Sequence, residues 1–473
     1  MRKQLIPVFL AVLLAAEVCT ACHQYDSQSS SGPEIKRVDA LEDSKEEGPT
    51  LSQQDKLDAT VPSLDLKDGG DEEINPEIVI ATDIHYLAKE LTDFGDAFEN
   101  MVNNGDGKIT TYVWEITDAF LDEVIDRRPQ ALIISGDLTL EGERLSHEAL
   151  AQKLRKVEQE GISVLVIPGN HDLNNPKAAS YKGMEAIPAT RTTPQEFVSI
   201  YDEFGYGEAV SRDPASLSYI AQLKDGTWIL MLDSCQYEDE SYVGGMIRTE
   251  TYEWMEEMLD AAWYEHRQVI AVAHHNLFEE SRVYETNCTI EHADDLIERL
   301  AGWEIKLFLS GHLHVQHYKS SEEYEIDEIV TGSLSMSPCT YGVLKYFGDG
   351  AFAYHTESVD VSRWAEERGN PDANLHDFEG YADTFLQEIF YNQAEENLKK
   401  YALSARQSQE MANVYALLNV YAVSGNAWQI KDSVLAMPAY KQWQEYERSD
   451  IFCMYMNEIV EDAEYDYNVF KRP

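Results

Sequence analysis

The sequence predicts a domain of mixed strands and helices, α/β in its local pattern, followed by a region of helices. Six short apolar runs rich in β-branched residues recur between residues 76 and 357, and longer amphipathic segments such as 111–127 and 145–160 separate them. Runs of that length between helical patterns indicate buried strands joined by helices. The runs are IVIA (78–81), ALIIS (131–135), VLVIP (164–168), WILML (228–232), VIAVA (269–273) and LFLS (307–310).

Five of the predicted strands end in side chains of the types that bind metal ions. In open α/β sheets, sites form outside the carboxyl ends of the strands, where loops bring distant residues together. Each block alone is typical of a turn or a cap, but five blocks in one domain favour a shared site. The residues are Asp83 and His85; Asp137; Asn170, His171 and Asp172; His274 and His275; and His312 and His314.

The donor types indicate which ions the site would hold. Carboxylate, imidazole and amide groups without a thiolate suit Mn, Fe or Zn better than Ca, which prefers oxygen ligands alone. The donors exceed what one ion can use, so two divalent ions bridged by a carboxylate, about 3.5–4 Å apart, fit better. NNGDGKI (103–109) looks like half of an EF-hand loop, but Val113 stands where a bidentate glutamate is needed, so we expect a plain turn there.

The order of the blocks along the chain resembles a known family. The blocks are Asp-x-His (83–85), Gly-Asp (136–137), Gly-Asn-His-Asp (169–172), His-His (274–275) and Gly-His-x-His (311–314). Together they resemble the calcineurin-like metallophosphoesterase superfamily over about residues 76–357. The resemblance implies an α+β fold in which two β-sheets lie between layers of helices, a four-layer αββα sandwich, with the C-terminal α-helical region added to it.

The resemblance also implies how the ligands divide between two ions. One ion would be held by Asp83, His85 and His314, and the other by Asn170, His274 and His312. Asp137 would bridge both ions. The family pattern favours the first histidine of the adjacent pair, His274, and leaves His275 as the alternative.

The chemistry implied by the resemblance is hydrolysis of a phosphate ester. A hydroxide between the two ions would attack phosphorus in line while the ions neutralise the phosphoryl oxygens. His171, next to the ligand Asn170, would protonate the leaving oxygen. Asp172 would either orient that imidazole or cap the turn. We expect His147, on the helix predicted over 145–160, to be solvated or to act as a cap rather than to reach the site.

Departures from sister families narrow the substrate class. GDLTLEG (136–142) lacks the arginine of the protein phosphatases, and Leu140 stands where purple acid phosphatases have a tyrosine ligand. GDLTLEGERLSH and PGNHD resemble the class III cyclic-nucleotide phosphodiesterases. We therefore expect a phosphoric diester hydrolase acting on small-molecule phosphodiesters, cyclic nucleotides first among them. The alternatives are a phosphomonoesterase or nucleotidase using the same site, and a non-catalytic ligand-binding lipoprotein, against which the bridging Asp137 argues.

The first 75 residues predict export. Arg2 and Lys3 precede an apolar run too short to span a bilayer, and VCTAC, ending at Cys22, resembles a bacterial lipobox. Residues 1–22 are thus expected to be a lipoprotein signal peptide that leaves a lipid on Cys22, and the acidic segment 23–75 a disordered tether. The protein would then sit on the outer face of the cytoplasmic membrane, or be secreted. The net charge of −49 argues against a nucleic-acid polymer as partner, and we expect a monomer.

The chain divides near residue 370. Residues 76–370 form the predicted catalytic domain, and residues 371–473 repeat apolar residues at helical spacing, in 377–400, 411–421 and 438–463. Two interpretations of this helical region stay open. It is either a bundle that packs its own core, or a cap that presents an aromatic side chain, such as Trp428, to a nucleobase.

Overall fold

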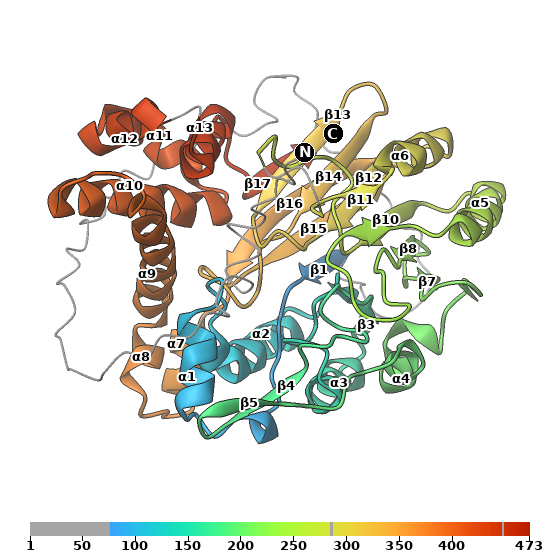
Figure 1. Ribbon diagram of the computed structural model, residues 1–473. Helices are drawn as coiled ribbons and strands as arrows, with labels where there is room; N and C mark the ends of the chain where they lie inside the picture. The colour runs from blue at the N-terminus through green and yellow to red at the C-terminus, as the bar shows by residue number, and fades with distance from the viewer. Residues whose placement is uncertain (1–75, 284–286, 447–448) are drawn as a thin grey trace, which may run out of the picture.

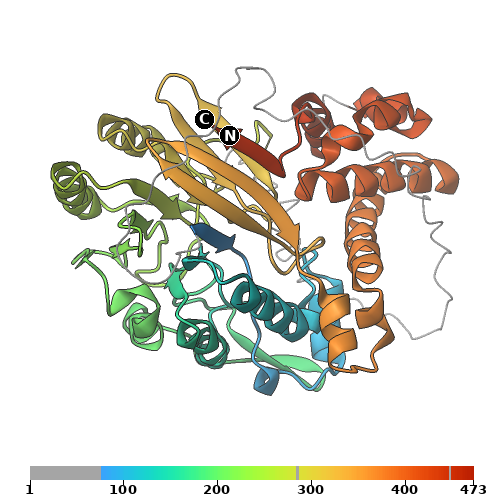
Figure 2. The same cartoon turned by 180° about the vertical axis from the view of Figure 1, so that it is seen from behind.

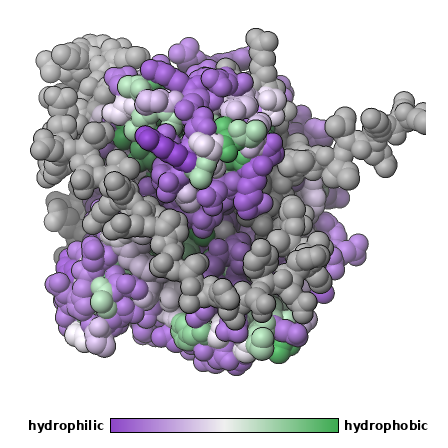
Figure 3. Space-filling view, turned by 60° about the vertical axis from the view of Figure 1, so that its left-hand side comes forward, coloured by the Kyte–Doolittle hydropathy of each residue, from purple (hydrophilic) through white to green (hydrophobic). Residues whose placement is uncertain are grey.

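The computed structural model describes residues 76–283, 287–446 and 449–473, and the predicted signal peptide and tether lie outside this range. The described chain forms two stacked sheets with helices around them and a group of helices to one side (Figures 1 and 2). Among the described helices, none is long and apolar enough to cross a membrane. Most of the described surface visible in Figure 3 is hydrophilic, with small separate hydrophobic groups.

The first sheet contains the first three predicted strands. It has six strands in the order β17-β16-β15-β1-β2-β3, of which β1, β2 and β3 are parallel and the others antiparallel to their neighbours. Ala81, Ile134 and Val166 are aligned in register, so β1, β2 and β3 end level with one another. The strands are β1 (Glu77–Ala81), β2 (Ala131–Ile134), β3 (Ser163–Val166), β15 (Thr340–Gly348), β16 (Ala351–Ser358) and β17 (Val469–Arg472).

The second sheet contains the other three predicted strands. It has seven strands in the order β13-β14-β12-β10-β8-β7-β6, with β14, β12, β10 and β8 parallel at its centre. The strands are β6 (Ser211–Arg212), β7 (Tyr219–Gln222), β8 (Trp228–Leu232), β10 (Val269–Ala273), β12 (Leu307–Ser310), β13 (His317–Ser321) and β14 (Ile326–Val330). Two short ribbons lie outside both sheets, β4 (Ala179–Lys182) with β5 (Glu185–Pro188), and β9 (Gly245–Met246) with β11 (Ile290–Glu291).

Successive side chains of a strand point to opposite faces of the sheet, and this alternation produces the four layers. In β8, Ile229 and Met231 join the core shared with the first sheet, whereas Leu230 joins a separate core with helices α5 and α6. On the first sheet's side, α2 and α3 contribute residues such as Phe120 and Leu154 to the shared core cluster. The helices are α2 (Val113–Arg127), α3 (Arg144–Gln159), α5 (Thr249–Tyr264) and α6 (Ala293–Gly302). The predicted helix–sheet–sheet–helix fold is confirmed.

Shorter helices complete the described part of the chain before residue 360. One of them, α4, begins with the capping box of Thr193 and Glu196 and has Pro194 in its first turn, as the stretch TTPQEF indicates. These elements are η2 (Lys89–Leu91), α1 (Asp96–Asn103), η3 (Thr110–Tyr112), α4 (Pro194–Ile200) and η4 (Asp202–Tyr206).

The C-terminal helices have a core of their own. Tyr415, Trp443 and Met456 are completely buried in a cluster separate from the sheets. The segment 438–463, in which apolar residues repeat at helical spacing, contains two α-helices. Pro438 starts the first, and Asp450 caps the second by accepting the Phe452 N–H at 2.8 Å. The helices are α7 (Val361–Glu367), α8 (Ala373–His376), α9 (Phe378–Leu398), α10 (Ala405–Val423), α11 (Ala427–Ala436), α12 (Pro438–Trp443), η5 (Gln444–Tyr446) and α13 (Ile451–Asp462).

The end of the chain returns to the first sheet. Strand β17 pairs antiparallel with β16, with Phe470 opposite Tyr354 and their rings stacked at 4.8 Å. The C-terminal region is therefore attached to the sheet at both of its ends, by α7 and by β17. Backbone contact also joins the two parts directly, since Gln316 N–H donates to the Val423 carbonyl at 2.9 Å.

Candidate metal centre

The ends of parallel strands from both sheets meet at one place. The loop after β1 runs beside the loop after β2, since Asp83 N–H donates to Gly136 O and His85 N–H to Asp137 O. The second sheet joins them where His312 N–H donates to Asp83 Oδ2 at 3.0 Å. All seven predicted ligands are buried there, as expected for residues at the carboxyl ends of parallel strands. They are Asp83, His85, Asp137, Asn170, His274, His312 and His314.

One group of ligands converges around Asp83. Its Oδ1 lies 3.2 Å from His314 Nε2 and 3.7 Å from His85 Nε2. The two imidazole nitrogens face each other at 3.1 Å. Asp137 completes this group, with potential ligand atoms of all four side chains within 4.8 Å of one another. This is the set predicted for the first ion, together with the predicted bridging carboxylate.

A second group converges around Asn170. Its Oδ1 lies 2.9 Å from His312 Nδ1 and 3.1 Å from His274 Nε2. The Oδ2 of Asp137 is 3.5 Å from His274 Nε2 and 3.7 Å from His85 Nε2. One oxygen of Asp137 therefore faces both groups, which is the position that a bridging carboxylate needs.

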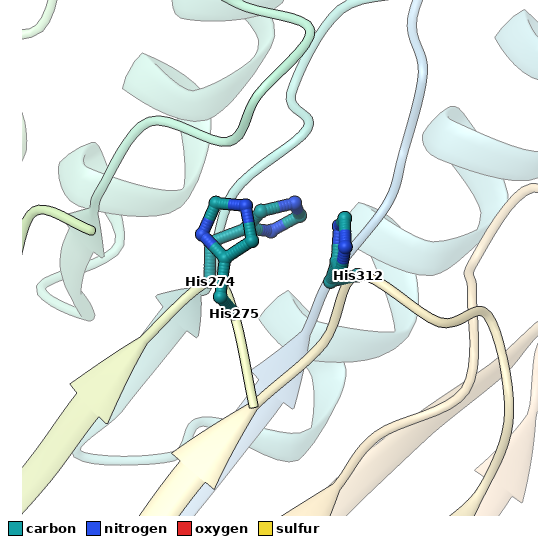
Figure 4. A group of neighbouring side chains, drawn as sticks. All are labelled: His274, His275 and His312. Atoms are coloured by element: carbon teal, nitrogen blue, oxygen red, sulfur yellow. The ribbon is translucent and has the colours of Figure 1, made fainter. Parts of the chain in front are cut away.

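The hydrogen bonds separate the roles of the two adjacent histidines. His274, His275 and His312 lie close together at the ends of neighbouring strands (Figure 4). Both ring nitrogens of His275 are engaged elsewhere, Nδ1 at 2.8 Å from Ser234 Oγ and Nε2 at 2.9 Å from the Val243 carbonyl. His274 contacts the Ser135 carbonyl through Nδ1 at 2.9 Å, which turns Nε2 toward the centre. This geometry favours His274 as the ligand.

The centre contains polar atoms that a cation would satisfy. Asp83 Oδ1, which faces the His85 and His314 imidazoles, is buried and has no hydrogen bond of normal geometry among the described residues. Burial opposes ionisation of Asp83, but the surrounding histidines, His314 first, outweigh burial and hold the pKa of its carboxyl well below its usual range. Oxygen and nitrogen donors without thiolate are the set that Mn, Fe and Zn accept. The residues thus fit a pair of divalent ions.

The backbone around the ligands adopts an uncommon conformation. Five of the ligands have φ in the left-handed region, between 48° and 71°. Glycines allow the ligand side chains to lie close to neighbouring backbone. A Cβ on Gly169 would lie 2.2 Å from Asp137 Oδ1, and one on Gly136 would lie 2.4 Å from His274 Nδ1. Gly-Asp and Gly-Asn-His-Asp are therefore needed for packing as well as for their donors. The five ligands are Asp83, His85, Asp137, His312 and His314.

Two family models match the chain. The model of the calcineurin-like phosphoesterases matches residues 76–316, which is 241 of the 473 residues and about half of the chain. The chain belongs to the calcineurin-like phosphoesterase family. The model described as the C-terminal domain of cyclic nucleotide phosphodiesterase matches residues 360–466.

Solved structures similar to this calcineurin-like phosphoesterase share little sequence with it. A dimetal phosphatase from Danio rerio is 10% identical, covers 60% of this chain and 96% of its own, and gives a TM-score of 0.43. The purple acid phosphatase PPD1 of yellow lupin is 13% identical, with 60% and 51% covered and a TM-score of 0.39. A phosphopantetheinyl hydrolase from Mycobacterium tuberculosis is 12% identical, with 55% and 90% covered and a TM-score of 0.31. No curated protein matches the chain.

His171 lies at the edge of the metal centre. Its backbone N–H donates to Asp137 Oδ1 at 2.8 Å, and its Nε2 lies 3.9 Å from Asp137 Oδ2. On its other side, Nδ1 is 3.0 Å from Glu141 Oε2, and that carboxylate also accepts the Asn175 amide at 2.7 Å. Burial lowers the pKa of His171, but Asp137 and Glu141 outweigh it and raise that pKa to about 9. These two carboxylates favour the protonated imidazole, which is the form that can donate a proton.

Asp172 is a cap and does not orient His171. Its Oδ2 accepts the N–H of Leu138 at 3.0 Å, and its Oδ1 accepts the N–H of Thr139 at 3.0 Å and the Thr139 hydroxyl at 2.9 Å. Of the two predicted roles, the structure supports turn capping. The residue that holds the His171 imidazole is Glu141, which the sequence did not single out.

His147 does not reach the metal centre, but it is not solvated either. Its Nδ1 lies 2.9 Å from the Tyr201 hydroxyl and its Nε2 lies 3.1 Å from Thr139 Oγ1. The side chain is completely buried, so the expectation of a solvated or capping histidine is wrong. It joins α3 and α4 to the loop that follows Asp137.

Proposed function

We propose that this calcineurin-like phosphoesterase is a phosphodiesterase that works with two divalent metal ions held by the two ligand groups. The observation that carries the proposal is the position of Asp137, whose Oδ2 faces His85 at 3.7 Å and His274 at 3.5 Å. When bound there, two cations supply charge for the phosphoryl oxygens and lower the pKa of water. Membership of the family supports hydrolysis of a phosphate ester.

The chain's own residues supply positioning and a proton. Asp137 is kept in place by the His171 N–H on Oδ1, which leaves Oδ2 for the metal side. The protonated imidazole of His171, held by Glu141, would donate its Nε2 proton to the leaving alkoxide oxygen. A proton donor is most useful for an alcohol leaving group, whose own pKa is high, and ordinary phosphodiesters have such a group.

Two observations favour a diester with an organic substituent of nucleoside size, such as a cyclic nucleotide. Residues 360–466 match the model of the cyclic nucleotide phosphodiesterase C-terminal domain. A cavity of about 370 Å³ lies between that region and the catalytic domain, with Trp428 and Tyr455 on one side and Leu313 on the other. Leu313 stands between the ligands His312 and His314, and the volume falls in the range of small-molecule sites.

The location proposed for the protein follows from its first residues, and the net charge of −49 argues against nucleic-acid polymers as partners. We propose a lipid on Cys22, a position on the outer face of the cytoplasmic membrane, and a monomer that meets small phosphodiesters there rather than nucleic-acid polymers. The rival functions are a phosphomonoesterase or nucleotidase with the same two ions, and a lipoprotein that binds its ligand without hydrolysing it. Mn, Fe and Zn are the ions proposed for the site.

The experiment compares two chromogenic esters. The purified protein, loaded with Mn²⁺, is assayed on bis(p-nitrophenyl) phosphate and on p-nitrophenyl phosphate, before and after removal of metal with EDTA. Metal-dependent hydrolysis that favours the diester supports the proposal, and cyclic nucleotides of different bases are then compared. A preference for the monoester would replace the proposal with the phosphomonoesterase function. Absence of hydrolysis with Mn²⁺, Fe²⁺ and Zn²⁺ would favour the alternative in which the lipoprotein binds its ligand without hydrolysing it.

A further inference from the structure

The cavity between the two parts of the chain contains polar atoms that the protein leaves without a partner. Its volume is about 370 Å³, and residues of the loop after β10 and of α11 and α13 line it. Two of its lining residues have a buried polar atom with no hydrogen-bond partner among the described residues, Glu280 Oε1 and Trp428 Nε1. Buried polar atoms in folded proteins are almost always paired. One of these atoms is an acceptor and the other a donor, so a ligand in the cavity would satisfy both.

Glu280 keeps one carboxylate oxygen for the cavity. Its Oε2 lies 2.6 Å from His317 Nδ1, and the other nitrogen of that imidazole, Nε2, lies 2.6 Å from Asp462 Oδ2. The His317 ring also packs against Tyr467, with the two ring centroids 4.1 Å apart. The Glu280 side chain is only 5% exposed. The fold therefore holds the carboxylate through Oε2 and leaves Oε1 as a hydrogen-bond acceptor shielded from water.

The acidic side chains at the cavity determine which part of a phosphodiester it accepts. The lining residues include five carboxylates against two lysine or arginine side chains and His317. Arg282, one of the two, is already paired with Glu458 and Glu461. A phosphate group would therefore be repelled, whereas an uncharged group with hydrogen-bond donors would be attracted. The ester phosphate thus belongs at the metal ions and its substituent in the cavity. The carboxylates are Glu279, Glu280, Glu458, Glu461 and Asp462.

Backbone carbonyls connect the cavity to the metal centre. The Asn287 carbonyl, on a residue that lines the cavity, lies 2.8 Å from Nε2 of the ligand His312. The Val243 carbonyl, on another lining residue, lies 2.9 Å from His275 Nε2. Leu313, which stands between two ligands in the sequence, forms part of the wall. The cavity wall and the residues that support the ligands are therefore shared, as a site for the substituent of a metal-bound ester requires.

A nucleobase with an amino group satisfies both unpartnered atoms. In adenine and cytosine an amino N–H donor lies beside a ring nitrogen that accepts, so the first can pair with Glu280 Oε1 and the second with Trp428 Nε1. Because His317 takes the other oxygen, Glu280 cannot bind two adjacent N–H groups of guanine at once. The ring N–H of uracil is flanked by two carbonyl oxygens, which the carboxylate would repel. A quaternary ammonium such as choline suits acidic and aromatic walls but offers no acceptor to the indole N–H.

We propose that the cavity binds the base of the phosphodiester, with Glu280 selecting a base that has an amino group and Trp428 donating to the ring nitrogen beside it. The inference rests on the proposed function and deepens it, because it names the groups that distinguish one nucleotide from another. It also gives the C-terminal helices a part in substrate binding, since Trp428 belongs to α11.

The test uses nucleosides as probes, because they carry no phosphate and their binding does not depend on turnover. Two pairs differ only in the amino group, adenosine against purine riboside and cytidine against pyrimidin-2-one riboside. Binding to the Mn²⁺-loaded protein is measured by calorimetry, with choline as a further probe. Glu280→Gln offers a donor in place of the acceptor, and Trp428→Phe keeps an aromatic ring but removes the N–H. The matched controls are Glu279→Gln, an exposed carboxylate at the same cavity, and Trp303→Phe, which packs against the core beneath α5 and α6.

In wild-type protein we expect the nucleoside with the amino group to bind about tenfold more tightly than its partner in at least one pair, the effect of one hydrogen bond to a charged group. Glu280→Gln should remove this preference, and Trp428→Phe should weaken both members of the pair alike. Both controls should keep the wild-type values. Thermal unfolding shows whether each variant folds, and Trp428→Phe tests the cavity independently if Glu280→Gln does not.

Three results would overturn the proposal: no preference in either pair, a preference that survives in Glu280→Gln, or binding of choline in place of the nucleosides. The KM for the 3′,5′-cyclic nucleotide of the preferred base tests whether that base belongs to the substrate. It should rise about tenfold in Glu280→Gln and stay constant in Glu279→Gln, and an unchanged KM in Glu280→Gln would contradict this assignment. An amino-group preference in a protein that hydrolyses no ester would refute the proposed function but not the base site.

Discussion

The Nδ1 atom of His171 lies 3.0 Å from the Glu141 carboxylate, at the edge of the metal centre. The pair places the imidazole beside the metal ligands, with its other nitrogen 3.9 Å from Asp137 Oδ2, and Asp137 and Glu141 raise its pKa despite burial. Such an arrangement is typical of a general acid whose orientation and charge are set by a carboxylate.

His171→Ala should slow hydrolysis most for esters with poor leaving groups. Loss of a proton donor costs about 10²–10⁴-fold in rate when the leaving alkoxide needs protonation, and much less when a nitrophenolate leaves. The measurement is kcat/KM for an alkyl phosphodiester and for bis(p-nitrophenyl) phosphate. Equal losses for the two substrates would argue against proton donation.

Glu141→Gln tests whether the carboxylate acts through His171. Because Glu141 raises the pKa of His171, we expect the alkaline limb of the pH–rate profile to move to lower pH. The variant should also lose more activity on esters with poor leaving groups, as His171→Ala does, but to a smaller extent. Glu148→Gln on the exposed face of α3 is the control. An unchanged pH profile would show that Glu141 only packs against the imidazole.

Asp137→Asn should remove activity while leaving the fold intact. An amide oxygen cannot provide the charge that a bridging carboxylate gives to two cations, and we expect a loss of at least the roughly 10²–10³-fold that removing one electrostatic contact to the reacting group costs. Circular dichroism and thermal unfolding of the metal-free variant are expected to match those of metal-free wild-type protein. Retained activity would refute the bridging role.

His274→Ala and His275→Ala should show which of the two adjacent histidines binds a metal ion. We expect His274→Ala to bind one ion fewer, because its Nε2 points at Asp137 and Asn170. His275→Ala should keep both ions but lose about 1–3 kcal/mol of unfolding free energy, because the Ser234 hydroxyl and the Val243 carbonyl lose their partner. Metal counting and chemical denaturation measure both effects. The opposite pattern would assign the ligand to His275.

Glu143→Gln should make stability less dependent on pH. Burial, and then the charge of Glu141, raises the pKa of Glu143 to about 8, above the value of 4.5 expected in the unfolded chain. The folded protein therefore holds a proton that the unfolded chain releases, and this contribution to stability is complete below pH 4.5 and is lost as pH rises through 8. The neutral amide avoids that loss, so its advantage in unfolding free energy should grow across this window, to the order of a few kcal/mol. Parallel stability curves for the two proteins would contradict the shift.

Much of the fold was predictable from sequence because buried strands and amphipathic helices leave strong local patterns. The strand WILML (228–232) is apolar throughout because both of its faces are covered, and it coincides with β8. Strand β17 was not predictable, because VFKR gains its conformation only by pairing with β16. The break between α12 and α13 has local causes in Pro438 and Asp450, but the apolar period continues across it.

The metal ligands were predictable because they follow strands directly, where position in sequence fixes position in space. The residues around them depend on loop conformation instead. Glu141 reaches His171 only because the chain turns after Leu138, where Asp172 accepts the backbone N–H groups. Glu141 has no sequence pattern that distinguishes it from an ordinary surface charge.

The central claim is that two ions act together in a centre built from seven side chains. The most direct test is a titration of metal-free protein with Mn²⁺, in which bound ions per chain and hydrolysis of bis(p-nitrophenyl) phosphate are measured at each step. The account predicts two ions per chain and activity that appears as the second ion binds. Full activity with a single ion, or a chain that binds no Mn²⁺, Fe²⁺ or Zn²⁺, would contradict it.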